Sequence, residues 1–279
     1  PRILKRILIA FWILIASGFL SLFLLFILIS TGAFGKLPTF EELENPESSL
    51  ATQVISADGE VLGVYYSENR SNVLYEDLSE NLINALIATE DERFYKHSGI
   101  DFIAIGRVIR GLVWGEYAGG GSTITQQLAK NLFPREDLNS IELVIRKFKE
   151  WVIAVKLERS YTKEEIIAMY FNTVEFSDNA FGIQSASKTY FNKEPAELLP
   201  EEAAVLVGML KAPYKFNPRI NPQNSKERRN VVLMKMNEYG FLSDSSLDSM
   251  KVQDIKLEFK AASHNEGPAP YFREVLRME

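Results

Sequence analysis

The longest apolar segment of the chain lies at its beginning. Residues 7–29 read ILIAFWILIASGFLSLFLLFILI and hold no charged side chain over 23 positions. A helix of about 20 apolar residues crosses a hydrocarbon core of about 30 Å. A cleaved signal peptide has a shorter apolar region, of about 7 to 15 residues, followed by a small-residue cleavage site. The pattern therefore predicts an uncleaved transmembrane anchor over residues 1–31.

The pattern changes twice after the anchor. Residues 35–49 are polar and contain two prolines, as a short stalk would, and residues 52–66 alternate around Asp58-Gly59, a two-residue hairpin signal. From Leu78 to about Tyr239 the apolar positions follow a helical period almost throughout. We therefore expect a mainly α fold with a minor β element: a stalk and β-hairpin over 32–77, and a helical domain over 78–250. Residues 251–279, which end in a Gly/Pro-containing segment, are expected to begin a linker to a C-terminal domain outside this chain.

The distribution of charge predicts the orientation of the anchor and excludes one class of partner. Arg2, Lys5 and Arg6 precede the apolar run and the first acidic residue is Glu41, so the positive-inside rule predicts a cytoplasmic N-terminus and an external remainder. That remainder holds 28 basic and 37 acidic residues, a net charge of −9, so nucleic acid is not an expected partner. The chain has no cysteine, which excludes disulfides and thiolate metal sites.

A carboxylate continues the apolar stripe of one predicted helix. In SENLINALIATED, Ser79 is a candidate N-cap, and the stripe runs through Leu82, Ile83, Leu86 and Ile87. Glu90 falls on the same face, where it would be partly removed from water, at a helix end that disfavours negative charge. Glu90 is therefore a candidate functional residue. The alternative is an ordinary solvated helix end.

A second candidate carboxylate lies in the segment 140–160. Apolar side chains at Val144, Phe148, Trp151, Val152 and Val155 form one face of the predicted helix. Arg146 and Glu150 lie opposite, among further apolar residues. A helix that is apolar nearly all round is expected at the centre of a fold, with Arg146 and Glu150 as a charged pair that lines a cavity. The alternative is a surface salt bridge.

Between the two carboxylates lies a glycine-rich segment that is followed by polar donors. Gly119–Gly121 leave the backbone open to close approach by a ligand, and a helix start after them would attract anions. The donors that follow are Ser122, Thr123, Gln126, Gln127 and Lys130. Together they predict a site for phosphate and sugar. A plain glycine hinge is the alternative, and a P-loop is excluded because Gly121-Ser122 stands where that motif needs Gly-Lys.

Five ordered motifs resemble one family. They are E-D-x-x-F-x-x-H-x-G at Glu90, Asp91, Phe94, His97 and Gly99; G-G-S-T-I-T-Q-Q at 120–127; R-K-x-x-E at Arg146, Lys147 and Glu150; K-x-x-I-x-x-x-Y-x-N at Lys163, Ile166, Tyr170 and Asn172; and R-R-x-x-V-L at Arg228, Arg229, Val232 and Leu233. This pattern is similar to the glycosyltransferase domain of class A penicillin-binding proteins, family 51 of glycosyltransferases. Ser177 departs from it, because glycine is expected there, before NAFGI.

The resemblance implies a reaction and a role for each candidate residue. The family polymerises lipid II into glycan strands, and Glu90 would be the general base that deprotonates the acceptor's 4-hydroxyl. Lys130, Arg146 and Lys147 would stabilise the departing undecaprenyl diphosphate, and Glu150 would orient these cations or the diphosphate, with or without a divalent ion such as Mg or Mn. The other substrate-binding candidates are Asp91, Phe94, His97, Ser122, Thr123, Gln126, Gln127 and Asn172. For His97 the alternative is a structural role, in which it braces the loop by hydrogen bonds. No residue is assigned as a certain metal ligand.

The resemblance also implies an architecture and a location. It predicts a lysozyme-like helical body with a small membrane-proximal lobe, in which residues 102–117 dip into the membrane interface, unless they form an ordinary core helix. The expected place is the bacterial cytoplasmic membrane, crossed once, and the expected partners are lipid II, the growing glycan strand, membrane lipids and cell-wall synthesis proteins. Two alternatives stay open: a membrane-anchored hydrolase of glycan, and a catalytically silent scaffold of cell-wall machinery.

Overall fold

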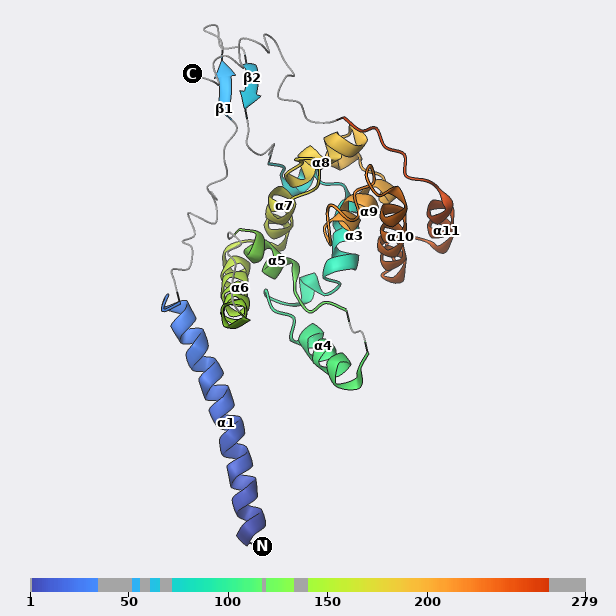
Figure 1. Ribbon diagram of the computed structural model, residues 1–279. Coiled ribbons are helices and arrows are strands. Elements are labelled where there is room, and N and C mark those ends of the chain that lie inside the picture. The colour runs from blue at the N-terminus through green and yellow to red at the C-terminus, as the bar shows by residue number, and fades with distance from the viewer. Residues whose placement is uncertain are drawn as a thin grey trace.

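The protein is mainly α-helical, as the sequence predicts. The computed structural model describes residues 2–34, 52–55, 61–65, 72–116, 119–132 and 140–260 (Figure 1). Its helices are α1 Arg2–Ser30, α3 Glu80–Glu90, α4 Phe102–Trp114, α5 Ile124–Asn131, α6 Ser140–Ser160, α7 Lys163–Thr173, α8 Gly182–Phe191, α9 Pro200–Met209, α10 Pro222–Glu238 and α11 Asp244–Val252, with short 3-10 turns η1 Tyr75–Asp77, η2 Phe94–Lys96 and η3 Pro195–Glu197.

Helix α1 is the predicted anchor. Among the described residues it is the helix long and apolar enough to cross a membrane, and most of its apolar side chains are exposed. It extends away from the helical body and meets it at α6 (Figure 1). At that meeting point the Phe26 ring lies 5.3 Å from the Phe148 ring, edge to face, and 6.3 Å from the Trp151 ring, stacked (centroid distances).

The minor β element is an antiparallel pair, as expected from the alternating pattern. Strand β1, Thr52–Ile55, pairs with β2, Val61–Tyr65, so that Thr52 lies opposite Tyr65 and Val54 opposite Gly63. The pairing ends at Ile55 and Val61. The turn predicted at Asp58-Gly59 lies outside the described residues.

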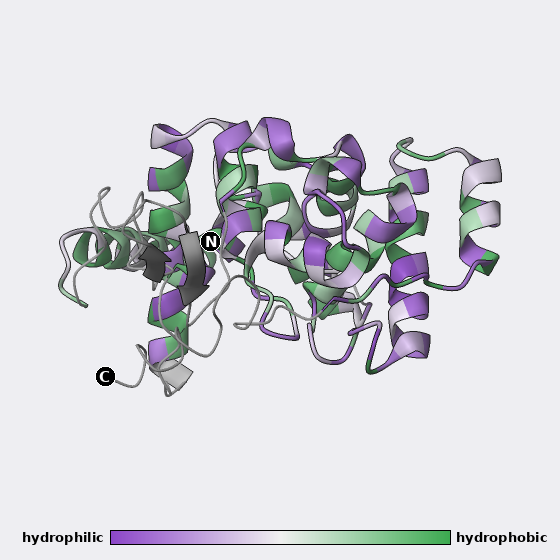
Figure 2. Cartoon of the chain, turned by 90° about the horizontal axis from the view of Figure 1, so that it is seen from above, coloured by the Kyte–Doolittle hydropathy of each residue, from purple (hydrophilic) through white to green (hydrophobic). Residues whose placement is uncertain are grey.

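Helix α3 runs through the core of the body. Ser79 caps it by accepting a hydrogen bond from the Leu82 N–H, and the predicted stripe of Leu82, Ile83, Leu86 and Ile87 is buried. Helices α9 and α10 pack on α3 and on each other, while α5 packs on α6 and α7. Buried apolar residues of these helices form one hydrophobic core. Figure 2 shows hydrophobic and hydrophilic residues alternating along them.

Helix α6 differs from its prediction as a central helix. Leu143 and Val144 are more than half exposed, and α6 lies at the edge of the body (Figure 1). Its buried face consists of Glu150, Ile153, Ala154 and Leu157. The sequence shows apolar residues on both faces because the opposite face, which holds Phe148 and Trp151, meets the anchor rather than the core.

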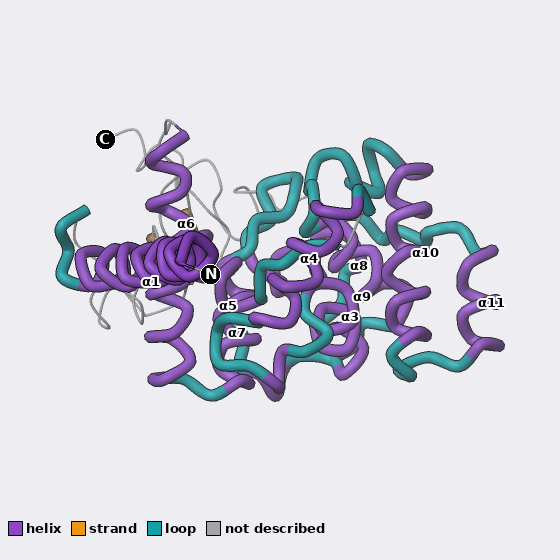
Figure 3. The backbone as a smooth tube through the Cα atoms, turned by 90° about the horizontal axis from the view of Figure 1, so that it is seen from below, coloured by secondary structure: helices purple, strands orange, loops and turns teal. Residues whose placement is uncertain are grey.

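Helix α4 carries an exposed apolar surface. It lies on the side of the body toward which α1 extends (Figures 1 and 3). Six large apolar side chains on it are more than half exposed: Phe102, Ile103, Ile109, Leu112, Val113 and Trp114. Asp101 caps its start, and Gly115, with φ of 72°, ends it. An ordinary core helix would bury such residues, so the alternative reading of 102–117 as a core helix is wrong.

The segment that follows α11 packs on the body. The Arg229 guanidinium is buried and donates to the carbonyls of Met250 and Gln253, at 3.1 and 2.8 Å. Further along, the N–H of Glu258 donates to the carbonyl of Tyr190 at 3.0 Å. The described residues up to 260 therefore lie along the helical body.

Candidate functional site

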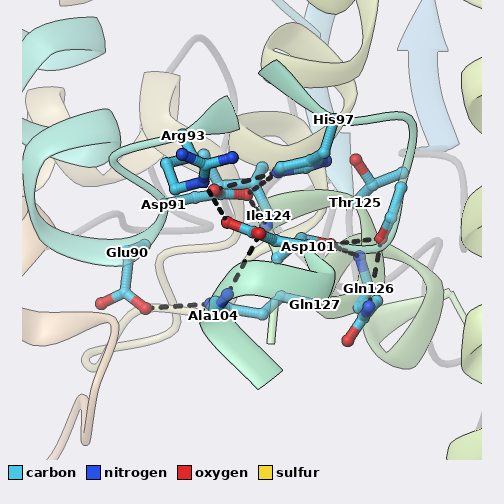
Figure 4. Close-up of polar contacts among 12 residues, drawn as sticks. Glu90, Asp91, Arg93, His97, Asp101, Ala104, Ile124, Thr125, Gln126 and Gln127 are labelled. Carbon is cyan, nitrogen blue, oxygen red and sulfur yellow. Dashed lines mark hydrogen bonds and ion pairs between the residues drawn. The ribbon is translucent and has the colours of Figure 1, made fainter. Parts of the chain in front are cut away.

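Glu90 ends α3 as a half-buried carboxylate with two partners. Its side chain is 18% exposed, so one part of it is open to solvent or a ligand. The Gln127 side-chain amide donates to Glu90 Oε2 at 2.9 Å (Figure 4). On the other oxygen, Arg228 Nη2 lies 3.8 Å from Oε1. An amide donor and a cation thus face a carboxylate that is partly open to a ligand, an arrangement that suits a general base.

The neighbouring carboxylate, Asp91, points into the protein (Figure 4). Asp91 is buried, and both of its oxygens lie 3.0 Å from His97 Nε2. Its Oδ2 also accepts the backbone N–H of Ile124, the first residue of α5, at 3.0 Å. Asp91 and His97 therefore hold the loop after α3 against the start of α5, and neither side chain is more than slightly exposed.

The same loop is supported by a buried ring and by an N-cap. Phe94 is fully buried, with Lys163 Nζ 4.1 Å from its ring centroid, so the ring supports the loop from inside. Asp101 accepts the N–H groups of Ile103 and Ala104 and pairs with Arg93 at 2.9 Å. Burial alone would raise the pKa of Asp101, but these hydrogen bonds and the charge of Arg93 bring it below its usual value.

Gly99 joins this loop to two helices. Its carbonyl accepts Thr123 Oγ1 at 2.8 Å and Gln126 Nε2 at 3.1 Å. Its φ is 89°, and its Cα lies so close to α6 that an added Cβ would come within 2.9 Å of the Ala154 carbonyl group. Thr123 also caps α5 by accepting the Gln126 N–H. Thr123 and Gln126 are buried and act on the protein's own backbone.

A cation cluster lies at the start of α5. Lys147 Nζ donates to Ser122 Oγ at 3.0 Å and to Glu150 Oε2 at 2.8 Å, and Arg146 Nε lies 3.9 Å from Glu150 Oε1. Glu150 is buried, whereas the Lys147 side chain is 43% exposed. One buried carboxylate thus orients two cations, and the glycine-rich segment meets them through Ser122. This arrangement suits an anionic ligand group.

The structure does not bring all the predicted site residues together. Glu90 and Gln127 form one contact, and Ser122, Arg146, Lys147 and Glu150 form the other. Lys130 is exposed in the last turn of α5. Asp91, Phe94, His97, Thr123 and Gln126 support the loop and α5 from within. Asn172 makes its contacts elsewhere. Its side-chain oxygen accepts the N–H of Val73 and its NH₂ group donates to the carbonyl of Val73, each at 2.9 Å. Asn172 therefore holds the segment before α3.

Two residues at the site had no role assigned from the sequence. Arg228 approaches Glu90 from α10, and Tyr170 on α7 donates to Gln127 at 3.1 Å. Arg228 belongs to the motif R-R-x-x-V-L and Tyr170 to the motif K-x-x-I-x-x-x-Y-x-N, so the sequence motifs already included both residues. In the described part of the chain, His, Asp and Glu side chains form no cluster of three or more that could hold a metal ion.

The fold and the site together define a class of protein. A mainly helical body presents one half-buried carboxylate beside an amide donor of α5, with a cation cluster at the start of the same short helix. Such an arrangement suits acid–base chemistry on a substrate that carries negative charge. The chain matches the model of the transglycosylase family over residues 58–237, and it belongs to that family.

Known relatives are longer than this chain. It is 36% identical to penicillin-binding protein 1A of Neisseria cinerea over 247 residues, which cover 88% of this chain and 30% of that protein. It is 37% identical to penicillin-binding protein 1F of Bacillus subtilis over 229 residues, 82% of this chain and 31% of that protein. A crystal structure of penicillin-binding protein 1A from Haemophilus influenzae aligns with 83% of this chain and 24% of its own, at 24% identity and a TM-score of 0.45. The chain thus spans between about a quarter and a third of the length of these relatives.

Proposed function

We propose that this chain is a peptidoglycan glycosyltransferase that joins lipid II units into β-1,4-linked glycan strands, with inversion and release of undecaprenyl diphosphate. Family membership supports transfer of a glycosyl group. The observation that carries the proposal is the position of Glu90, a half-buried carboxylate at the end of α3 that is held by Gln127 and faced by Arg228.

Glu90 takes a proton in this reaction. The 4-hydroxyl oxygen of the acceptor sugar attacks the anomeric carbon of the donor, and its proton passes to the Glu90 carboxylate. The bond between the anomeric carbon and the diphosphate oxygen breaks, and its electron pair leaves with the diphosphate. Attack from the face opposite the leaving group inverts the anomeric centre. A base in position at the acceptor contributes about 10²–10⁴-fold to such a step.

The cation cluster stabilises the charge that develops on the leaving group. Lys147 and Arg146 are held by the buried Glu150, and Lys130 adds a third cation from α5. Thr123, at the start of α5, and Gln127 are four residues apart, or about 6 Å along the helix axis. The base and the cations Arg146 and Lys147 therefore lie at the first turn of one short helix, and the reaction places them on opposite sides of the donor's anomeric carbon. A Mg or Mn ion bound to the lipid diphosphate would add charge stabilisation there.

The N-terminal apolar helix α1 and the exposed apolar surface of α4 support a reaction at a membrane. Arg2, Lys5 and Arg6 precede the apolar run of α1, which favours a cytoplasmic N-terminus and an external helical body, at the bacterial cytoplasmic membrane. The exposed apolar side chains of α4 lie on the same side of the body (Figure 1). An apolar surface of this kind can enter the membrane interface, where the lipid tail of the substrate is held.

The test is polymerisation of labelled lipid II by the detergent-solubilised protein, with products resolved by length on a gel. The wild type is expected to give a ladder of glycan, and Glu90→Gln is expected to give none. The matched control is Glu80→Gln, which removes an exposed carboxylate from the first turn of the same helix and should keep the ladder.

Other results of this assay would support the hydrolase or the scaffold instead, or would remove the role of Glu90. Shortening of preformed glycan by the wild type, with no ladder from lipid II, would replace the proposal with a hydrolase. No change in either substrate would favour a silent scaffold for cell-wall synthesis proteins. A ladder from Glu90→Gln equal to that of the wild type would remove the role of Glu90 as base.

A further inference from the structure

A buried tyrosine is connected to Glu90 through one amide. Tyr170 lies on α7 and is 1% exposed. Its hydroxyl donates to Gln127 Oε1 at 3.1 Å, and Gln127 Nε2 donates to Glu90 Oε2 at 2.9 Å. Two hydrogen bonds therefore lead from the core of the protein to the carboxylate, across three helices.

The direction of these hydrogen bonds is fixed at both ends. An ionised carboxylate only accepts, so the amide of Gln127 must turn its NH₂ group to Glu90 and its carbonyl to Tyr170. The tyrosine must then donate. Burial, and after it the negative charge of Glu90, raises the pKa of Tyr170 well above its usual value, so the hydroxyl keeps its proton at any working pH.

We propose that Tyr170 is a positioning residue for glycosyl transfer, which holds the Gln127 amide in the orientation that keeps Glu90 ionised and in place. The inference rests on the proposed function of Glu90. Without the tyrosine hydroxyl, the amide can turn its carbonyl toward the carboxylate. That orientation repels the ionised form and accepts a hydrogen bond from the protonated form.

The two oxygens of Glu90 have different neighbours. Gln127 donates to Oε2, and Arg228 on α10 lies 3.8 Å from Oε1. Tyr170 on α7 is close enough for the charge of Glu90 to raise its pKa. Arg228 remains in Tyr170→Phe, so any change in that variant reports the loss of the hydroxyl.

The experiment compares Tyr170→Phe with a matched control. Phenylalanine keeps the buried ring and removes only the oxygen. The control is Tyr190→Phe, because Tyr190 is also fully buried and its hydroxyl donates at 2.9 Å to Asp178, in a separate network. We expect both variants to lose some stability. Only Tyr170→Phe should lower kcat, by about threefold to tenfold as for the loss of one hydrogen bond between neutral groups, with KM little changed.

The pH dependence distinguishes positioning from general damage. In Tyr170→Phe the acid limb of the pH–rate profile should move to higher pH, because an amide carbonyl turned toward Glu90 would disfavour the ionised carboxylate. In Tyr190→Phe it should stay where it is in the wild type. An unchanged profile and kcat in Tyr170→Phe would overturn the inference while polymerisation by the wild type still supported the proposed function.

Two further measurements keep the inference falsifiable on other grounds. If Tyr170 acts through Gln127, the loss caused by Tyr170→Phe should largely disappear in a Gln127→Met background, and additive losses would overturn the inference. Carbon-13 NMR of glutamate labelled at the carboxyl carbon, with the Glu90 signal assigned by its loss in Glu90→Gln, follows the titration without turnover. The Glu90 midpoint should rise in Tyr170→Phe, and an unchanged midpoint would overturn the inference even in a protein that polymerises nothing.

Discussion

Replacement of Gly99 by alanine should destabilise the site through backbone contact alone. Gly99 has a φ of 89°, and an added Cβ would meet Ala154 C and O at 2.9 Å and Val155 N at 3.1 Å. These three atoms belong to the backbone of α6, so they cannot move aside as the end of a side chain could. The Gly99 carbonyl also accepts Thr123 and Gln126, so any shift of Gly99 displaces α5.

The expected loss of stability in Gly99→Ala has two parts. Alanine in a left-handed backbone conformation costs about 1–2 kcal/mol. Forcing a methyl group into a packed contact costs about 1–3 kcal/mol more. A domain of 150–250 residues loses about 2–4 °C of Tm per kcal/mol, so Gly99→Ala should lower Tm by roughly 10 °C. Activity should fall with it, because α5 carries Gln127.

A second glycine provides the control. Gly240 has a φ of 81°, and an added Cβ there would meet nothing within 4 Å. Gly240→Ala should therefore show the conformational part alone, a loss of about 3–6 °C. The assay is thermal unfolding of both variants in one detergent, followed by tryptophan fluorescence. Equal melting temperatures for Gly99→Ala and Gly240→Ala would show that the contact between Gly99 and α6 is not rigid, and would refute the reasoning.

Two further predictions concern the acid stability of the body and the membrane contact of α4. Burial alone would raise the pKa of Asp178, but hydrogen bonds from Arg219 and two other side chains lower it, so its stabilisation is present above about pH 4 and lost as pH falls further. Asparagine tolerates the positive φ of 60° at this position, so Asp178→Asn should lower the free energy of unfolding by about 1–3 kcal/mol at pH 7 through lost hydrogen bonds. Urea unfolding of the wild type and the variant at pH 7 and pH 3 should show a smaller difference in this free energy at pH 3. An equal difference at both pH values would contradict the prediction. Trp114, 70% exposed on α4, should be quenched by brominated lipid in vesicles that hold the full chain with Trp12→Phe and Trp151→Phe, and an unquenched signal would place α4 in water.

The sequence predicted features that depend on local periodicity. The burial of Glu90 followed from its place on the stripe through Leu82, Ile83, Leu86 and Ile87, and the cap at Ser79 followed from residue type. The orientation of α6 did not follow, because both of its faces are apolar and periodicity cannot choose between them. Burial of the Glu150 face is decided by the helices that pack on it, and the face of Phe148 and Trp151 is covered in part by Phe26, more than 100 residues earlier in the chain.

The sequence could not predict which polar side chains form hydrogen bonds with each other, for a related reason. Tyr170 and Gln127 are 43 residues apart, and Asn172 and Val73 are 99 apart. Each pair depends on how α7 packs against another segment, which no local pattern encodes. The resemblance placed Asn172 among the ligand-binding residues, yet its amide is engaged on both sides by the backbone of Val73. A motif thus identifies residues that matter to the fold as readily as residues that touch a substrate.

The adjacency of Glu90 and Asp91 has a geometric reason. Asp91 accepts the backbone N–H of Ile124, the first residue of α5, where the helix dipole favours negative charge. Glu90 accepts the side chain of Gln127, three residues further along the same helix. The two carboxylates therefore both accept hydrogen bonds from the first turn of α5, and a rotation of α5 would break both contacts together. One carboxylate fixes the helix so that the other meets its amide donor, which is why the chain needs both acids side by side at the end of α3.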